Sequence, residues 1–187
     1  MRQGVRAVFL DRDGVINDDR GYVHRIEDFQ FLAGALEGAS RLHQAGYQLI
    51  VITNQAGIAH GYFDEDAFLR LTRWMEQQFE AAGAPLAGVY HCPHHPEAKL
   101  ERLRRACSCR KPSPGLILQA IEDHGIDPAK SALIGDKPSD MEAAARAGIQ
   151  QRFLVRSPHV PPGEPRVFAS LLEVARHLTQ SATDVGT

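Results

Sequence analysis

The chain of 187 residues has no apolar run of the roughly 20 residues that a membrane span needs. Its N-terminus lacks a signal-peptide pattern, so we expect a cytoplasmic protein without a membrane partner. Its formal net charge is only −2, so no excess of positive charge favours nucleic acid. No internal repeat, low-complexity segment or linker divides it. We therefore predict a monomer with a single domain over residues 1–187 and a disordered tail after residue 178.

Cysteine is scarce, and the three that occur are clustered at Cys92, Cys107 and Cys109. An odd, clustered set in a reducing compartment indicates a metal site rather than disulfide bonds. Together with His94, three thiolates and one imidazole match a closed, structural zinc site. Two alternatives stay open on the sequence alone: His95 as the fourth ligand, or three free thiols beside a surface histidine pair.

The most informative stretch is a short apolar run, residues 7–10, that stops at Asp11, Asp13 and Gly14. A continuous apolar run is typical of a buried parallel strand, and its period of two points both carboxylates to the same side. At ~4 Å and an effective dielectric near 20, two carboxylates repel each other by roughly 4 kcal/mol. The arrangement therefore suits a bound cation or a held proton. Taken alone, the stretch is equally typical of a solvated acidic turn.

The apolar pattern alternates between short strands and amphipathic helices along the whole chain. Strands are predicted at residues 7–10, 47–53, 89–91, 131–134 and 152–155. Helices are predicted between and after them, with N-terminal signals at Asp64, Ser113 and Ser170. This alternation predicts a Rossmann-like α/β fold, with a parallel sheet covered by helices on both faces. The carboxyl ends of the strands then share one edge, where ligands bind in such sheets.

Polar residues follow the first, second and fourth predicted strands, at Asp11, Thr53 and Asp136. Each has a local explanation: Thr53 could bond its own turn, and Asp136 could cap the following helix. Lys111 could belong to a solvated basic loop. The predicted topology nevertheless brings the strand ends together, which favours one catalytic site built from distant segments.

These residues resemble the four motifs of the haloacid dehalogenase superfamily of phosphatases. The matching motifs are Asp11-x-Asp13-Gly-Val, Thr53, Lys111-Pro112 and Gly135-Asp136-x-x-x-Asp140. The chain resembles more closely the D-glycero-D-manno-heptose 1,7-bisphosphate 7-phosphatase family, through Gly-Tyr-Val-His, Cys-Pro-His-His-Pro and Cys-Ser-Cys-Arg-Lys-Pro. The likeness fades after about residue 157, and Val15 departs from the Thr of many relatives. It implies a capless haloacid dehalogenase fold with a zinc-stapled loop at about residues 92–110, and it favours His94 as the zinc ligand.

The resemblance implies a role for each matching residue. Asp11 would be the nucleophile that forms an aspartyl-phosphate, and Asp13 would be the general acid and base. Thr53 and Lys111 would bind the transferring phosphoryl group. Asp136, with Asp11 and the backbone carbonyl of Asp13, would hold Mg²⁺, an ion that prefers oxygen ligands.

Only about 39 residues separate Asp13 from Thr53, which leaves no room for a cap domain. Loops must then select a small phosphosugar substrate, and we expect residues 17–25, 55–63 and 92–110 to do so. The resemblance makes Arg110 a substrate-recognition residue for a second phosphate, although a solvated arginine is the alternative. Asp140 is expected to steady Lys111 or the metal shell. Further substrate-binding candidates are Asp19, Tyr22, Asn54 and Gln55.

The predicted reaction is hydrolysis of the 7-phosphate of the heptose bisphosphate, which leaves the 1-phosphate. By resemblance this serves nucleotide-activated heptose and lipopolysaccharide biosynthesis. Histidinol-phosphate phosphatase is the enzymatic alternative, because its family shares the zinc loop and the Arg-Lys-Pro run. The Gly-Tyr-Val-His stretch favours the heptose family. A non-catalytic phosphosugar-binding scaffold is the third reading, but it requires a lost nucleophile or metal ligand, and none is missing.

Overall fold

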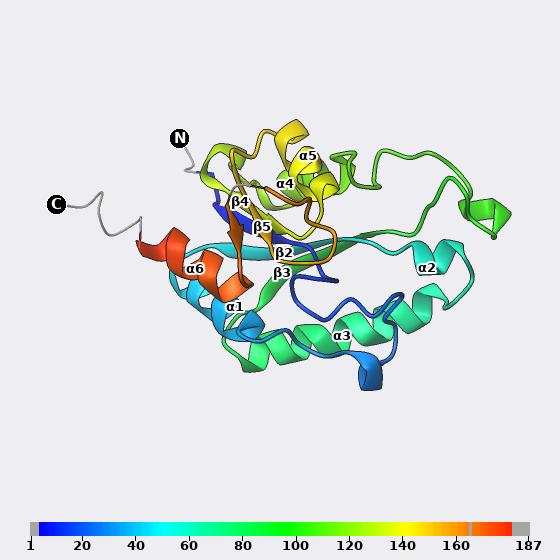
Figure 1. The fold of residues 1–187 in the computed structure, drawn as a ribbon, viewed down its shortest axis with the longest axis horizontal. Helices are drawn as coiled ribbons and strands as arrows, with labels where there is room; N and C mark the ends of the chain where they lie inside the picture. Colours follow the sequence, from blue (N-terminus) through cyan, green and yellow to red (C-terminus); the bar gives the residue numbers. More distant parts are fainter. Residues whose placement is uncertain (1–3, 165, 181–187) are drawn as a thin grey trace.

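The computed structural model describes residues 4–164 and 166–180. Its strands form one parallel sheet in the order β3-β2-β1-β4-β5-β6, which confirms the predicted α/β class (Figure 1). The strands are β1 (Ala7–Leu10), β2 (Gln48–Asn54), β3 (Leu86–Cys92), β4 (Ala132–Gly135), β5 (Gln151–Val155) and β6 (Val167–Phe168). The two-residue β6 was not predicted, and β3 is longer than the predicted 89–91.

Helices cover both faces of the sheet, as expected. In Figure 1, α1 (Ala35–Gln44), α3 (Glu65–Ala81) and α6 (Leu171–Gln180) lie below the sheet. The helices α4 (Gly115–His124) and α5 (Pro138–Arg146) lie above it. Along β1, Val8 and Leu10 pack against the face covered by α1, α3 and α6. Ala7 and Phe9 pack against the opposite face, which α4 and α5 cover. Both faces of β1 are therefore buried, which explains its continuous apolar run.

The predicted helix boundaries hold to within a few residues. Asp64 caps α3 by accepting a hydrogen bond of 2.7 Å from the Ala67 amide. The N-cap prediction for Ser113 is wrong by one residue, since Pro114 occupies that position and the Ser113 amide donates to Arg110 O in a preceding turn. At the other end of the chain, α6 runs to Gln180, two residues beyond the predicted end. The remaining tail, residues 181–187, lies outside the described residues.

The loops after β2 and β3 carry two elements too short for a sequence pattern to reveal. These are α2 (Ala56–Ala59) and the 3-10 helix Glu101–Leu103. Among the described residues, no helix combines the length and the apolarity that a membrane crossing requires.

Candidate active site

Asp11 and Asp136 meet at the point where the order of the sheet reverses. Asp11 directly follows β1 and Asp136 directly follows the adjacent β4. The Asp11 amide donates to Ile134 O over 3.0 Å, which holds the two strand ends together. One carboxylate oxygen each from Asp11, Asp136 and Asp140 lies within 4.8 Å of the others. The expected convergence of distant aspartates at a ligand-binding edge is therefore present.

Lys111 neutralises part of this cluster from inside the protein. Its Nζ lies 2.9 Å from Asp11 Oδ1 and 2.7 Å from Asp140 Oδ1. Burial opposes the charged form of Lys111, but Asp11 and Asp140 outweigh it and raise the pKa of Lys111 above its usual value. Burial also raises the pKa of Asp11 to about 7, although Lys111 opposes that shift.

Asp136 is the residue whose surroundings best suit a cation ligand. Its carboxylate oxygens are buried, and neither has a hydrogen-bond partner among the described residues. Gly14 adopts a φ of +88°, and a Cβ there would collide with the Asp136 carboxylate. A buried carboxylate that lacks a hydrogen-bond partner and lies beside Asp11 offers oxygen atoms as metal ligands. These ligands fit a hard divalent cation such as Mg²⁺.

Asp13 is held by three donors. Arg12 Nη2 contacts both of its carboxylate oxygens at 2.9 Å, and Asn17 Nδ2 and Gln55 Nε2 each donate over 3.0 Å. Gln55 Nε2 also donates to Thr53 Oγ1 over 2.8 Å, which ties the end of β2 to Asp13.

The side chain of Asn54 holds the backbone of Lys111. Asn54 Nδ2 donates to Lys111 O over 3.1 Å, and Asn54 Oδ1 accepts from the Lys111 amide over 3.0 Å. Both polar ends of this side chain are thus bonded to the loop that carries Lys111. The contact fixes the position of that lysine against β2.

Two adjoining cavities open at this edge, and they share Asp13, Asn54 and Lys137. The first, of about 210 Å³, contains the catalytic candidates. It is lined by Asp11, Asp13, Asn54, Arg110, Lys111, Lys137, Ser139 and Asp140. The second, of about 290 Å³, is lined by Asp13, Asp19, Gly21, Tyr22, Asn54, Gln55, Ala56, Gly57 and Lys137. The predicted catalytic and substrate residues therefore border one continuous region, except Thr53, which is 1% exposed and lines neither cavity.

The cysteines form a second cluster, with Cys92 at the end of β3 and Cys107 and Cys109 in the loop that follows. Cys109 Sγ lies 2.9 Å from Cys92 Sγ and 3.3 Å from Cys107 Sγ. His94 Nδ1 lies 3.3 Å from Cys109 Sγ, whereas His95 Nδ1 instead accepts from the Glu97 amide. Burial raises the pKa of the Cys92 thiol, so a thiolate there needs a nearby cation. This four-residue cluster could hold a zinc ion, with His94 as its histidine.

Comparison with known proteins agrees with this geometry. A family model described as "HAD-hyrolase-like" matches residues 108–159. A "D-glycero-beta-D-manno-heptose-1,7-bisphosphate 7-phosphatase" of Photorhabdus laumondii is 52% identical over 157 residues, 84% of this chain and 84% of that protein. The chain belongs to the heptose 1,7-bisphosphate 7-phosphatase family.

Other members of the heptose 1,7-bisphosphate 7-phosphatase family agree in sequence and structure. A D-glycero-alpha-D-manno-heptose-1,7-bisphosphate 7-phosphatase of Photorhabdus laumondii is 45% identical over 89% of this chain and 91% of that protein. The solved D,D-heptose 1.7-bisphosphate phosphatase from B. bronchiseptica, complexed with magnesium and phosphate, has a TM-score of 0.82 at 31% identity. That comparison covers 95% of this chain and 99% of the solved one. As a family member, the protein is a phosphoric monoester hydrolase.

The sequence analysis did not single out three residues that contact the candidate site residues in the structure: Arg12, Asn17 and Lys137. Arg12 is 1% exposed despite its charge, and its Nη1 has no partner in the part of the chain that the structure describes. An arginine between two aspartates, at the end of an apolar run, was the available signal. Lys137 was visible as the residue after Asp136, but nothing in the pattern indicated that it reaches Asp19, 3.3 Å away.

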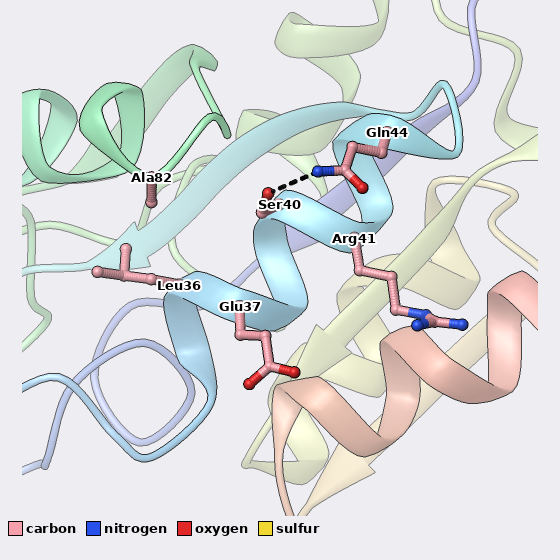
Figure 2. A pocket seen from close by; sticks show the side chains of 6 residues that line it. All are labelled: Leu36, Glu37, Ser40, Arg41, Gln44 and Ala82. Atoms are coloured by element: carbon pink, nitrogen blue, oxygen red, sulfur yellow. Dashed lines mark hydrogen bonds between the residues drawn. The ribbon is translucent and has the colours of Figure 1, made fainter.

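A further hollow, of about 330 Å³, lies where the strands begin rather than where they end. Figure 2 shows that α1 supplies most of its wall, with Ala82 facing it from the end of α3. Its polar groups already have partners: Gln44 donates to Ser40, and Arg41 Nε donates to Thr179 Oγ1 over 2.7 Å. This hollow contains none of the residues expected of the family's chemistry.

Proposed function

We propose that the protein hydrolyses the 7-phosphate of D-glycero-D-manno-heptose 1,7-bisphosphate and leaves the 1-phosphate on the sugar. The observation that carries the proposal is the buried Lys111–Asp11 ion pair beside the unpartnered carboxylate of Asp136. This grouping supports an anionic nucleophile, a fixed positive charge and a buried carboxylate that suits a divalent cation, all at one edge of the sheet. The heptose substrate itself comes from the names of relatives that share about half of the sequence.

The first chemical step is attack by an Asp11 carboxylate oxygen on the phosphorus of the 7-phosphate. A bond forms between this oxygen and phosphorus, and the bond from phosphorus to the sugar oxygen breaks. Asp13 donates its proton to that leaving oxygen. Lys111 and the Thr53 hydroxyl stabilise the charge that develops on the phosphoryl oxygens.

The second step returns the enzyme to its starting state. Asp13 accepts a proton from water as the water oxygen bonds to phosphorus and the bond to Asp11 breaks. Arg12, Asn17 and Gln55 keep the Asp13 carboxylate in place for both proton transfers. Asp11, Asp136 and the Asp13 backbone carbonyl would hold Mg²⁺, which when bound offsets negative charge at the phosphoryl group.

Substrate recognition is assigned to the two adjoining cavities. Arg110 and Lys137 supply positive charge beside the catalytic residues and suit the second phosphate. Asp19 and Tyr22 line the neighbouring cavity and suit the sugar. The sequence suggested Asn54 and Gln55 for substrate binding, and their side-chain amides are bonded to Lys111 and Asp13. We therefore assign them to positioning those two residues.

The test is phosphate release, with Mg²⁺, from the α and β heptose bisphosphates and from histidinol phosphate. We expect kcat/KM to be at least about tenfold higher for one of the bisphosphates, because a second phosphate adds charge-assisted hydrogen bonds. A preference for histidinol phosphate would overturn the proposed substrate. No release from any of the three would favour the binding scaffold.

We further propose that Zn²⁺ occupies the cluster of Cys92, His94, Cys107 and Cys109 and holds the loop that leads into Arg110 and Lys111. The loop also packs on α4, since a Cβ at Gly115 would collide with Ser108 O. Arg110 Nη1 donates to His94 O over 3.4 Å. A zinc ligand and a substrate-binding residue are thereby in direct contact.

Cys107→Ala is expected to lower the zinc content of the purified protein and its kcat/KM by roughly tenfold or more, because the loop loses a ligand. Metal analysis and phosphate release on the same preparation measure both effects. Ser108→Ala is the matched control, since it alters an exposed side chain between the two cysteines and should change neither. Full zinc content and full activity in Cys107→Ala would contradict the assignment.

A further inference from the structure

Side chains from three neighbouring loops meet beside the second cavity in a group that we call the rim cluster, and one of them, Tyr22, also lines that cavity. Its members are Tyr22 from the loop after β1, His60 and Tyr62 from the loop after β2, and His95 and Lys99 from the loop after β3. The Tyr22 and Tyr62 rings lie 4.7 Å apart, centroid to centroid. Lys99 Nζ lies 5.0 Å from the centroid of the Tyr62 ring. Tyr62 therefore touches a residue from each of the two other loops.

Tyr22 needs such support because of its backbone. Its φ is 55°, in the left-handed region that residues other than glycine rarely adopt. It also lines the second cavity, yet 48% of its surface remains exposed. Core packing thus does not fix the Tyr22 ring. Its nearest aromatic neighbour is Tyr62, which is itself 48% exposed and whose ring plane is tilted by 57° from that of Tyr22.

The loop that carries Tyr62 is in turn fixed by the loop that carries the cysteines. The Gln55 amide donates to Cys92 O over 2.8 Å, and the Leu100 amide donates to Ala59 O over 3.0 Å. In Figure 1 this green segment after β3 extends beside α2. A continuous set of contacts therefore runs from the cysteine loop through Tyr62 to Tyr22 and the second cavity.

We propose that Tyr62 is a positioning residue for the sugar. Its ring, braced by Lys99 on the cysteine loop, holds Tyr22 at the wall of the second cavity. This inference rests on the proposed function, since it concerns the part of the substrate that lies beyond the transferred phosphate. Within the described part of the chain, the Tyr62 ring lies against Tyr22, His60 and Lys99, none of which is a catalytic candidate, so we expect the ring to influence the substrate through Tyr22.

The test compares heptose 1,7-bisphosphate with acetyl phosphate, which carries a transferable phosphoryl group and no sugar. For Tyr62→Ala we expect the KM for the bisphosphate to rise about three- to tenfold, the size of a lost aromatic pair, with kcat little changed. The KM for acetyl phosphate should stay unchanged in Tyr62→Ala. Tyr62→Phe keeps the ring and should restore the KM for the bisphosphate. Leu118→Ala removes a similarly exposed apolar side chain from α4 and is the surface control.

A double-mutant cycle separates action through Tyr22 from a general loss of structure. In a Tyr22→Ala background, Tyr62→Ala should add less than about twofold to the KM, because the residue it positions is already gone. Additive effects, a parallel loss on acetyl phosphate, or an unchanged KM for the bisphosphate in Tyr62→Ala would each overturn the inference. Failure of the wild-type protein to hydrolyse the bisphosphate, with acetyl phosphate still hydrolysed, would instead overturn the proposed function on which it rests.

Discussion

Replacing Asp11 with asparagine is expected to lower kcat by roughly 10⁴-fold or more, the scale on which enzymes lose activity when a nucleophile is removed. The amide is close in size to the carboxylate but cannot attack phosphorus. The fold should survive, because the substitution removes one of three clustered carboxylates and Lys111 keeps its contact of 2.7 Å with Asp140. Phosphate release and the thermal unfolding midpoint of the same preparation measure the two effects.

The matched control for Asp11→Asn is Asp66→Asn, an identical chemical change at an exposed position on α3. It should leave kcat unchanged and lower the free energy of unfolding by at most about 1 kcal/mol, because Asp66 lies in the first turn of α3. A rapid quench with substrate labelled in the transferred phosphate should trap the phosphoryl group on the wild-type protein and not on Asp11→Asn. Undiminished turnover in Asp11→Asn would exclude the covalent route.

The sheet and the catalytic edge could be predicted because both follow from patterns spread along the chain. Continuous apolar runs, such as residues 7–10, indicate parallel strands, and the handedness of their connections places all of the carboxyl ends together. Asp11 and Asp136 each directly follow a strand, and Thr53 is the last residue but one of β2. Topology alone therefore brings them to one edge, whatever separates them in sequence.

The contacts of individual polar side chains could not be predicted in the same way. Asn54 ends β2 and Gln55 follows it, and the sequence predicted both as substrate-binding residues without indicating that their amides bond to Lys111 and Asp13. Arg12 shows the same limit, because its guanidinium turns back onto its neighbour Asp13. These pairings depend on side-chain rotamers and on which loops meet in space. Neither leaves a periodic trace in the sequence.

Lys111→Met should impair both stability and activity. The lysine is almost fully buried and is paired with both Asp11 and Asp140, so its removal leaves buried carboxylates without their cation. Removing one member of a buried ion pair lowers the free energy of unfolding by about 3–5 kcal/mol. The rate of phosphate release should also fall by roughly 10²- to 10³-fold, as when a fixed donor to a transition-state oxygen is lost. Chemical denaturation and phosphate release with Mg²⁺ measure these changes.

The pH dependence of stability distinguishes the loss of the Lys111 charge from a simple loss of packing. Burial already raises the pKa of Asp11 to about 7, and Lys111 is the group that opposes this shift. Without Lys111 the pKa of Asp11 rises further, so the folded state favours the protonated acid more strongly and loses stability as pH rises through that pKa. Without divalent cations, the destabilisation of Lys111→Met should therefore be larger near pH 8 than near pH 5.5.

Lys130→Met, which breaks an exposed pair of 3.3 Å with Asp127, should lower stability by at most about 1 kcal/mol at either pH. Equal destabilisation of Lys111→Met at both pH values would mean that its methylene groups, and not its charge, stabilise this edge of the sheet.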